Sequence, residues 1–208
     1  PASSSAASDV YKRQEDGPDL DIGASTVLWS GDERDYLLVG QKSGDVYALD
    51  PDKGGAVVWH NKVGRGGFLG GVHWGMSANG DSLFVPIADT TITGRFTGPV
   101  SPGIHALDPT SGEVRWYTPS VADCDGKSPI PVCDQGMSAA ITSTDQLVFA
   151  GSLDGNLNVY DSLSGEILWS FDTFGDFESV SGDTALGGSI ESDGPVPVSY
   201  THLRAHET

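Results

Sequence analysis

Three features of the sequence predict an all-β fold, organised as part of a β-propeller. The 208 residues include 28 glycines and many Asp, Ser and Pro turns, and stretches with helical periodicity are few. Short apolar, strand-like segments follow one another along the chain. A motif of an Asp, a turn and a Trp recurs at Trp59, Trp116 and Trp169, which lie 57 and 53 positions apart. A repeat of this length with short strands is typical of propeller blades.

The first blade is predicted from about Leu20 to His60. Alternating apolar residues mark its strands, and the glycine-containing segments at 42–45 and 51–55 are its turns. The predicted strands are Thr26–Trp29, Asp35–Gly40, Val46–Asp50 and Ala56–Trp59.

The second blade is predicted to begin near Gly70 and to end at Trp116. It opens on a glycine-rich segment that places Trp74 at the start of an inner strand. The apolar strand 83–89 follows and ends in the carboxylate of Asp89. A Gly-, Thr- and Pro-rich insertion over 90–102 separates this strand from the next.

The third blade is predicted to begin at Gln135, and Gly187–Ile190 opens a fourth. We therefore expect about three blades plus the start of another, from a larger propeller. An incomplete propeller leaves open strand edges, so this piece is expected to be poorly stable alone. The strands expected in the third blade are Leu147–Gly151, Leu157–Asp161 and Glu166–Phe171.

Both ends of the chain are expected to be foreign. Residues 1–14 and 198–208 resemble translated sequencing-library adapter DNA, read in opposite senses at the two ends. The alternative is a pair of natural, disordered tails. We expect the genuine protein to be residues 15–197, an internal fragment of a longer chain.

Composition restricts the possible partners. The formal net charge is −18, which argues against nucleic acid or an anionic membrane, because both require a basic face. No apolar run approaches the length of roughly 18 residues that a membrane-spanning helix needs. We therefore predict no nucleic-acid partner and no membrane span in this fragment.

The tryptophans fall into two classes. Trp59, Trp116 and Trp169 occupy one fixed place in each repeat, which predicts packing between blades. Trp74 lies outside that register, between Gly71 and Gly75. It could belong to the core, but a flat aromatic beside glycines on a channel-lining strand could also support a planar ligand.

The repeat [VA]-x-x-D-x-x-[ST]-G-E-[VI]-x-W resembles the tryptophan-docking motif of pyrroloquinoline quinone (PQQ) dehydrogenases, which form eight-bladed propellers. Gly70–Gly75 resembles their segment that carries the Trp stacked on the quinone. The segments Gln135–Ile141 and Phe149–Leu157 are similar to the polyvinyl-alcohol dehydrogenase branch. The resemblance covers residues 20–196.

This resemblance implies a periplasmic or secreted alcohol dehydrogenase that depends on PQQ and Ca²⁺. It would oxidise secondary alcohols, polymeric ones included, and would pass electrons to cytochrome c. Haem c could be bound by a part of the protein outside this fragment, and the fragment alone is expected to be inactive. The alternative is a non-catalytic PQQ-repeat propeller that acts as a scaffold for protein contacts.

The same resemblance implies roles for individual residues. Trp74 would stack under PQQ, with His73 and Gly75 beside it, although His73 could equally be a packed residue. Asp89, or Thr90 by a shift of one position, would supply an oxygen ligand to Ca²⁺, a cation that prefers oxygen donors. The alternative for Asp89 is a turn-forming residue before the insertion.

The segment after Trp116 resembles the loop that carries the catalytic carboxylate in quinoprotein alcohol dehydrogenases. Asp123 would be the general base that takes the hydroxyl proton. Asp125 would be a further metal ligand, at a position that favours a larger trivalent ion in some relatives. The alternative is an acidic surface loop. Many relatives carry Arg or Lys near the quinone, whereas the matching turn at 152–155 contains no cation.

Cys124 and Cys133 are the only cysteines. Without a C-x-x-C pair, a zinc site is not favoured. The simplest interpretation is a small loop disulfide, which would form in an oxidising compartment, the periplasm in the family that the chain resembles. This bond would fix the loop that carries Asp123 and Asp125.

Overall fold

The computed structural model describes residues 20–90, 96–127 and 133–197. These residues form β-strands and one short 3-10 turn, η1 (Pro51–Lys53). None of them belongs to a helix long and apolar enough to cross a membrane. The two ends predicted to be foreign lie outside the described residues.

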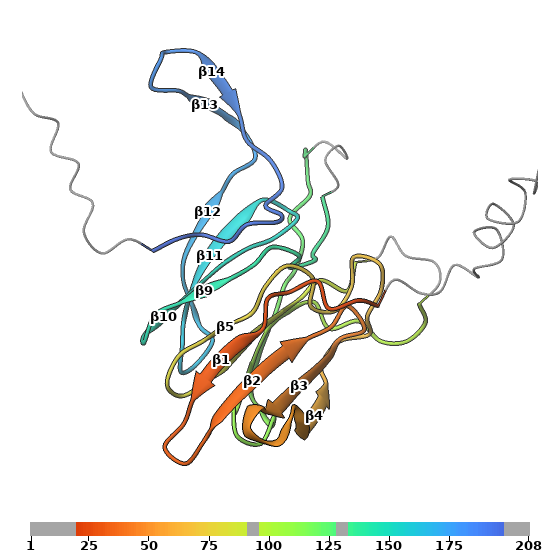
Figure 1. Ribbon diagram of the computed structural model, residues 1–208. Helices are drawn as coiled ribbons and strands as arrows, with labels where there is room; N and C mark the ends of the chain where they lie inside the picture. The colour runs from red at the N-terminus through yellow and green to blue at the C-terminus, as the bar shows by residue number, and fades with distance from the viewer. Residues whose placement is uncertain (1–19, 91–95, 128–132, 198–208) are drawn as a thin grey trace, which may run out of the picture.

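Twelve strands form three four-stranded antiparallel sheets, and in each sheet the strand order follows the sequence (Figure 1). Each sheet is a meander, which is the construction of a propeller blade. The all-β prediction is therefore confirmed, and so is the division into three blades. The strands are β1 (Val27–Ser30), β2 (Asp35–Gly40), β3 (Asp45–Asp50) and β4 (Ala56–Lys62); β5 (Ser77–Ala78), β6 (Leu83–Ile87), β7 (Gly103–Leu107) and β8 (Val114–Pro119); β9 (Thr142–Ser143), β10 (Leu147–Gly151), β11 (Asn156–Asp161) and β12 (Ile167–Asp172).

The repeated motif forms the turn between the third and fourth strands of a blade. Asp108 directly follows β7 at this turn, and its Oδ1 accepts backbone N–H groups of Thr110 and Ser111 at 2.8 and 3.2 Å. The N–H of Gly112 then donates to the Asp108 carbonyl at 2.8 Å. This conformation requires Gly112 at φ +75°, a left-handed value that glycine adopts without strain.

The Trp of one blade is seated on the motif turn of the next blade. Trp59 Nε1 donates to the Pro109 carbonyl at 2.8 Å, and Trp116 Nε1 donates to the Ser162 carbonyl at 3.1 Å. A Cβ on Gly112 would lie 2.5 Å from the Trp59 ring, so only glycine leaves room for it. The predicted docking role is therefore seen at Trp59 and Trp116. Trp169 on β12 is 51% exposed and has no fourth blade beside it in the described residues.

Two apolar cores lie between the three sheets. The first joins blades one and two around Leu38, Val46 and Leu83, and the second joins blades two and three around Phe84 and Met137. The inner strands β1, β5 and β9 lie side by side (Figure 1). Burial on both faces of β6 explains why this strand reads as a continuous apolar run in the sequence.

The fourth blade is less developed than its predicted start suggests. Residues 187–190 form no strand, and an exposed hairpin, β13 (Asp176–Glu178) and β14 (Thr184–Leu186), precedes them. This hairpin was not expected from the sequence. Its strands are three residues long, which is too short for a clear alternation of apolar and polar residues.

Candidate functional site

Each of blades two and three is preceded by an entry segment, residues 70–76 and 135–141. These two segments and residues 187–191, which follow blade three, are anchored in the same way. Val72 N–H donates to the Gln41 carbonyl, Met137 N–H to the Ile87 carbonyl, and Ile190 N–H to the Ser152 carbonyl. The residues that come next, His73, Ser138 and Glu191, are therefore structurally equivalent. Because these segments bond to a neighbouring turn, the predicted inner strand at Trp74 does not form. Trp74 lies three residues before β5.

Trp74 is an exposed indole on a buried segment. Its side chain is 43% exposed, whereas Val72 and Met76 on either side are buried. Gly75 packs closely, since a Cβ there would lie 2.9 Å from the Ala140 Cβ. The Trp74 ring is tilted against the His73 ring, with centroids 5.0 Å apart. A fixed backbone thus presents a flat aromatic surface, which suits a planar ligand.

His73 is joined to the two equivalent residues by hydrogen bonds. His73 Nδ1 lies 2.7 Å from Ser138 Oγ, which donates to Glu191 Oε1 at 3.1 Å. Because a hydroxyl has one hydrogen, this arrangement makes Ser138 the acceptor and His73 Nδ1 the donor. Ser138 and Glu191 were not singled out in the sequence, because their equivalence to His73 depends on the alignment of the repeats in space.

Asp89, the predicted calcium ligand, is fully buried and accepts four backbone N–H groups. Its Oδ2 accepts from Arg65 at 2.7 Å and from Ser101 at 3.1 Å. Its Oδ1 accepts from Gly66 at 3.0 Å and from Gly71 at 3.1 Å. The backbone at Asp89 has φ +39°, which is uncommon for a residue other than glycine.

These contacts bear on the metal site. A carboxylate has about four lone-pair positions, and at Asp89 four N–H donors are directed at them. N–H donors present positive charge, which repels a cation. Within the described ranges, no group of three His, Cys, Asp or Glu side chains could hold a metal ion. The geometry favours the turn-forming alternative for Asp89.

Asp154 has the position in blade three that Asp89 has in blade two. Each lies two residues after a carbonyl that accepts from an entry segment. Asp154 Oδ1 accepts from the Ser152 hydroxyl and from the Asn156 N–H, and Oδ2 accepts from the Asn156 side chain at 2.7 Å. The fourth donor is the backbone N–H of Asp123, at 3.1 Å from Oδ2.

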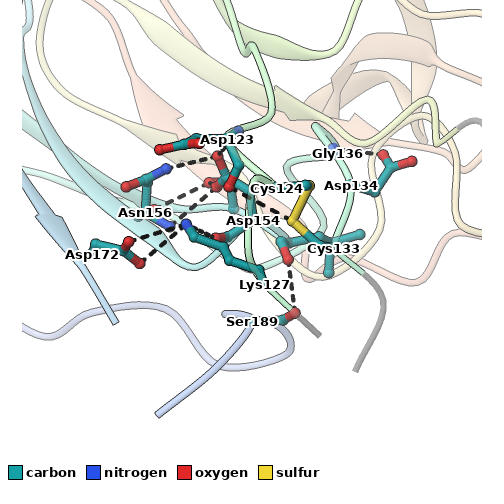
Figure 2. Close-up of a disulfide and its surroundings, with 12 residues drawn as sticks. Asp123, Cys124, Lys127, Cys133, Asp134, Gly136, Asp154, Asn156, Asp172 and Ser189 are labelled. Atoms are coloured by element: carbon teal, nitrogen blue, oxygen red, sulfur yellow. Dashed lines mark hydrogen bonds and ion pairs between the residues drawn. A yellow bond between two sulfur atoms is a disulfide. The ribbon is translucent and has the colours of Figure 1, made fainter. Parts of the chain in front are cut away.

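The predicted base therefore sits on a loop fixed to the blade-three turn (Figure 2). Cys124 and Cys133 form a disulfide, with Cα atoms 5.8 Å apart. Asp123 and Asp125 lie at this bond, and both are exposed. The position of the loop was not predictable from the sequence, since its contacts join residues about 30 positions apart.

Lys127 fixes the same loop from its other side (Figure 2). Its Nζ donates to the Asp154 carbonyl at 2.8 Å and lies 3.1 Å from Asp172 Oδ2. The Phe174 N–H and the Lys127 ammonium lower the pKa of the Asp172 carboxyl. The turn at 152–155 contains no cation of its own, but the fold places this lysine against it.

The predicted residues form two groups. His73, Trp74 and Gly75 lie on the entry segment whose Gly71 donates to Asp89. Asp123 and Asp125 lie on the disulfide loop at Asp154. Gly136 lies between the two turns: its carbonyl accepts the Leu153 N–H, and a Cβ on it would lie 2.8 Å from Thr90 Cγ2. Within the described residues, no hydrogen bond or ion pair joins Trp74 to Asp123 or Asp125.

Comparison with known proteins assigns the chain to a family. Residues 42–188, most of the chain, match the PQQ_2 family, described as outer membrane protein assembly factor BamB. The chain belongs to this family.

Relatives with curated descriptions agree with this PQQ-repeat assignment. A polyvinylalcohol dehydrogenase of Pseudomonas sp. is 37% identical over 182 residues, which are 86% of this chain and 28% of that protein. A second, from Sphingopyxis sp. (strain 113P3), is 35% identical over 181 residues, 86% of this chain and 27% of that protein. The chain thus spans less than a third of the length of these relatives.

A solved structure shows the same fold. The quinohemoprotein alcohol dehydrogenase from Comamonas testosteroni aligns with a TM-score of 0.53 at 18% identity, over 80% of this chain and 23% of that one. At this identity the likeness concerns the propeller fold alone. The resemblance to PQQ dehydrogenase propellers drawn from the sequence is confirmed by the family match and the relatives together.

Proposed function

We propose that this chain is part of a quinoprotein alcohol dehydrogenase that oxidises secondary alcohols, polymeric ones included. The observation that carries the proposal is the 37% identity to a polyvinylalcohol dehydrogenase over 86% of the chain. Because the chain spans 28% of that relative, the activity is proposed for the whole protein. The fragment alone is expected to be inactive.

The described residues fit PQQ at one face. The Trp74 indole is exposed on a buried, hydrogen-bonded segment, which provides a rigid platform for a planar ring system. The His73 ring contacts the Trp74 ring and is hydrogen-bonded to Ser138, so it restrains one edge of this platform. When bound there, PQQ would supply the hydride acceptor.

Asp123 is the proposed base for the substrate. Its exposed carboxylate would accept the proton of the alcohol hydroxyl as hydride leaves the carbinol carbon. The Asp154 carboxylate holds the Asp123 backbone, and the Cys124–Cys133 bond limits the movement of the loop. The chain therefore supplies a proton acceptor on a restrained loop, which is the condition for efficient general-base catalysis.

Calcium fits these residues less well. Asp89 is saturated by N–H donors, so we propose a structural role for it and derive no step through a metal ion. Asp125 is the exposed carboxylate that we retain as this chain's metal ligand. The remaining ligands, and any haem c, belong to other parts of the proposed whole protein.

A periplasmic or secreted location is proposed with the function. The disulfide at Cys124 supports an oxidising compartment. Cytochrome c is the proposed electron acceptor, as the sequence resemblance to PQQ dehydrogenases implies.

A second candidate is a non-catalytic scaffold. It is favoured by the description of the matching family, an outer membrane protein assembly factor, and by the saturation of Asp89. A scaffold would bind no PQQ, so cofactor binding separates the two candidates.

Dye reduction by the full-length protein with PQQ, Ca²⁺ and a secondary alcohol tests the dehydrogenase. We expect Asp123→Asn to lower kcat by about 10²- to 10⁴-fold with little change in KM, because the amide cannot take a proton. Asp81→Asn, at an exposed aspartate on a distant turn, is the matched control and should keep wild-type activity. Equal kcat in the wild type and the Asp123 variant would overturn the assignment of the base.

A further inference from the structure

Blade three differs from blades one and two at one pair of residues that face each other across two neighbouring strands. In blades one and two, the cross-strand pair next to the docking Trp is aromatic and stacked. Tyr47 faces His60, with ring centroids 4.7 Å apart, and His105 faces Tyr117, at 4.2 Å. The equivalent pair in blade three is Asn158 and Ser170, and Ser170 Oγ donates to Asn158 Oδ1 at 2.6 Å.

The smaller pair leaves space between blades two and three. Side chains alternate between the faces of a strand, so this pair lies on the face opposite Trp169. There a pocket of about 280 Å³ opens, which we call the inter-blade pocket. In blade two, by contrast, Tyr117 donates to the Pro102 carbonyl at 2.9 Å, so the aromatic pair is held in place. One wall of the inter-blade pocket is the end of β8 and the two residues after it, 119–121, and the other is the polar surface of β10–β12.

The lining of the inter-blade pocket is rich in hydrogen-bonding groups. Asn156, Asn158 and Tyr160 form a row on one face of β11, with Asn158 Nδ2 donating to the Tyr160 hydroxyl at 3.3 Å. Residues two apart on a strand are spaced by roughly 7 Å. Ser152 and Ser170 add hydroxyl groups beside this row. Asp154 also lines the pocket, but its carboxylate is already occupied by four donors.

The composition of this lining selects a class of ligand. Amide and hydroxyl groups both donate and accept, so they match hydroxyl groups of a ligand. A row of such groups along a strand suits an extended chain with repeated hydroxyls better than one compact alcohol. The volume is near the lower end of the range for ligand sites, roughly 300–1,000 Å³, and therefore fits a short segment of such a chain.

The inter-blade pocket is also close to the proposed base. Asp154, which lines it, accepts the backbone N–H of Asp123 at 3.1 Å. We propose that the inter-blade pocket is a subsite that binds a 1,3-diol segment of a polymeric alcohol next to the segment being oxidised. This inference rests on the proposed function and adds to it the means by which a polymer is held.

The test uses full-length protein without PQQ and a soluble oligomer of 1,3-diol units, with binding measured by isothermal titration calorimetry. The variant Asn158→His/Ser170→Tyr places the blade-two pair in blade three and fills the pocket. We expect it to bind the oligomer at least 10-fold more weakly than wild type. Ser170→Ala, which removes one hydroxyl without adding volume, should weaken binding about 3- to 10-fold.

Ser179→Ala, in the exposed segment between β13 and β14, is the matched control and should bind as wild type. Unchanged melting temperature of Ser170→Ala shows that any loss is local, even where the double variant fails to fold. The subsite is overturned by absence of oligomer binding to wild type, or by equal binding to wild type and Ser170→Ala.

Turnover separates this inference from the proposed function. With PQQ added, the double variant should raise KM for the oligomer and leave kcat/KM for 2-propanol unchanged. Oligomer binding that depends on Ser170 in a protein without any turnover would support the subsite and reject the dehydrogenase. Turnover with an unchanged KM for the oligomer in the double variant would reject the subsite alone.

Discussion

The sequence around Asp89 is compatible with two different roles for this residue. As a carboxylate after a strand, it satisfies the pattern of a calcium ligand and equally that of a turn residue. The four N–H donors around it distinguish the two, and the sequence cannot show them, because they come from Arg65, Gly66, Gly71 and Ser101 on other segments. Its charge ties the segment between blades one and two to the loop that precedes β7.

The structural role of Asp89 predicts a loss of stability on neutralisation. Asp89→Asn turns one acceptor oxygen into an NH₂ group that faces two N–H donors. We expect the free energy of unfolding to fall by about 2–4 kcal/mol in chemical denaturation, since hydrogen bonds to a charged, buried acceptor are lost. Asp81→Asn should change it by less than about 0.5 kcal/mol. A stable Asp89→Asn protein that has lost Ca²⁺ binding would instead restore the metal-ligand role.

At the scale of the element, the repeat was the most predictable part of the molecule. The Asp, Gly and Trp of the motif act locally and on the adjacent blade, so their spacing fixes the turn and its partner. The exposed hairpin at Asp176–Leu186 was not predictable, because its strands are short. Trp74 was predicted on a strand but lies before it, because its segment bonds to neighbouring turns rather than to a strand ladder.

Buried His105, in the cross-strand pair of blade two, predicts a dependence of stability on pH. Burial lowers the pKa of His105, and the hydrogen bond to the Ser101 carbonyl and the Asp89 charge only partly offset this. The unfolded chain therefore binds a proton at a higher pH than the folded chain does. Stability should fall as pH decreases through the unfolded pKa of about 6.5.

His105→Gln is the variant that checks this dependence, because Gln can still donate to the Ser101 carbonyl but does not titrate. Melting temperatures measured from pH 8 to pH 5 should decrease more steeply for wild type than for this variant. Parallel curves for the two proteins would exclude His105 as the cause.

At the scale of the whole molecule, three blades bring together segments that the sequence keeps far apart. The sequence predicted the fold class and the contacts of Trp59 and Trp116. The roles of the residues in both site groups stay predictions. The relation between those groups depends on Gly136 and on the turns at Asp89 and Asp154, which adjoin only after the blades pack. For the same reason, the inter-blade pocket exists only where blade three packs against the end of blade two.

The measurement that tests the central proposal most directly is PQQ binding to the full-length protein by titration calorimetry, with wild type beside Trp74→Ala. We expect wild type to bind and the variant to bind on the order of 10-fold more weakly or worse, with an unchanged melting temperature of the free protein, because an exposed indole contributes little to folding. Absence of binding to wild type, or equal affinity of the two proteins, would contradict a PQQ platform at Trp74 and favour the scaffold.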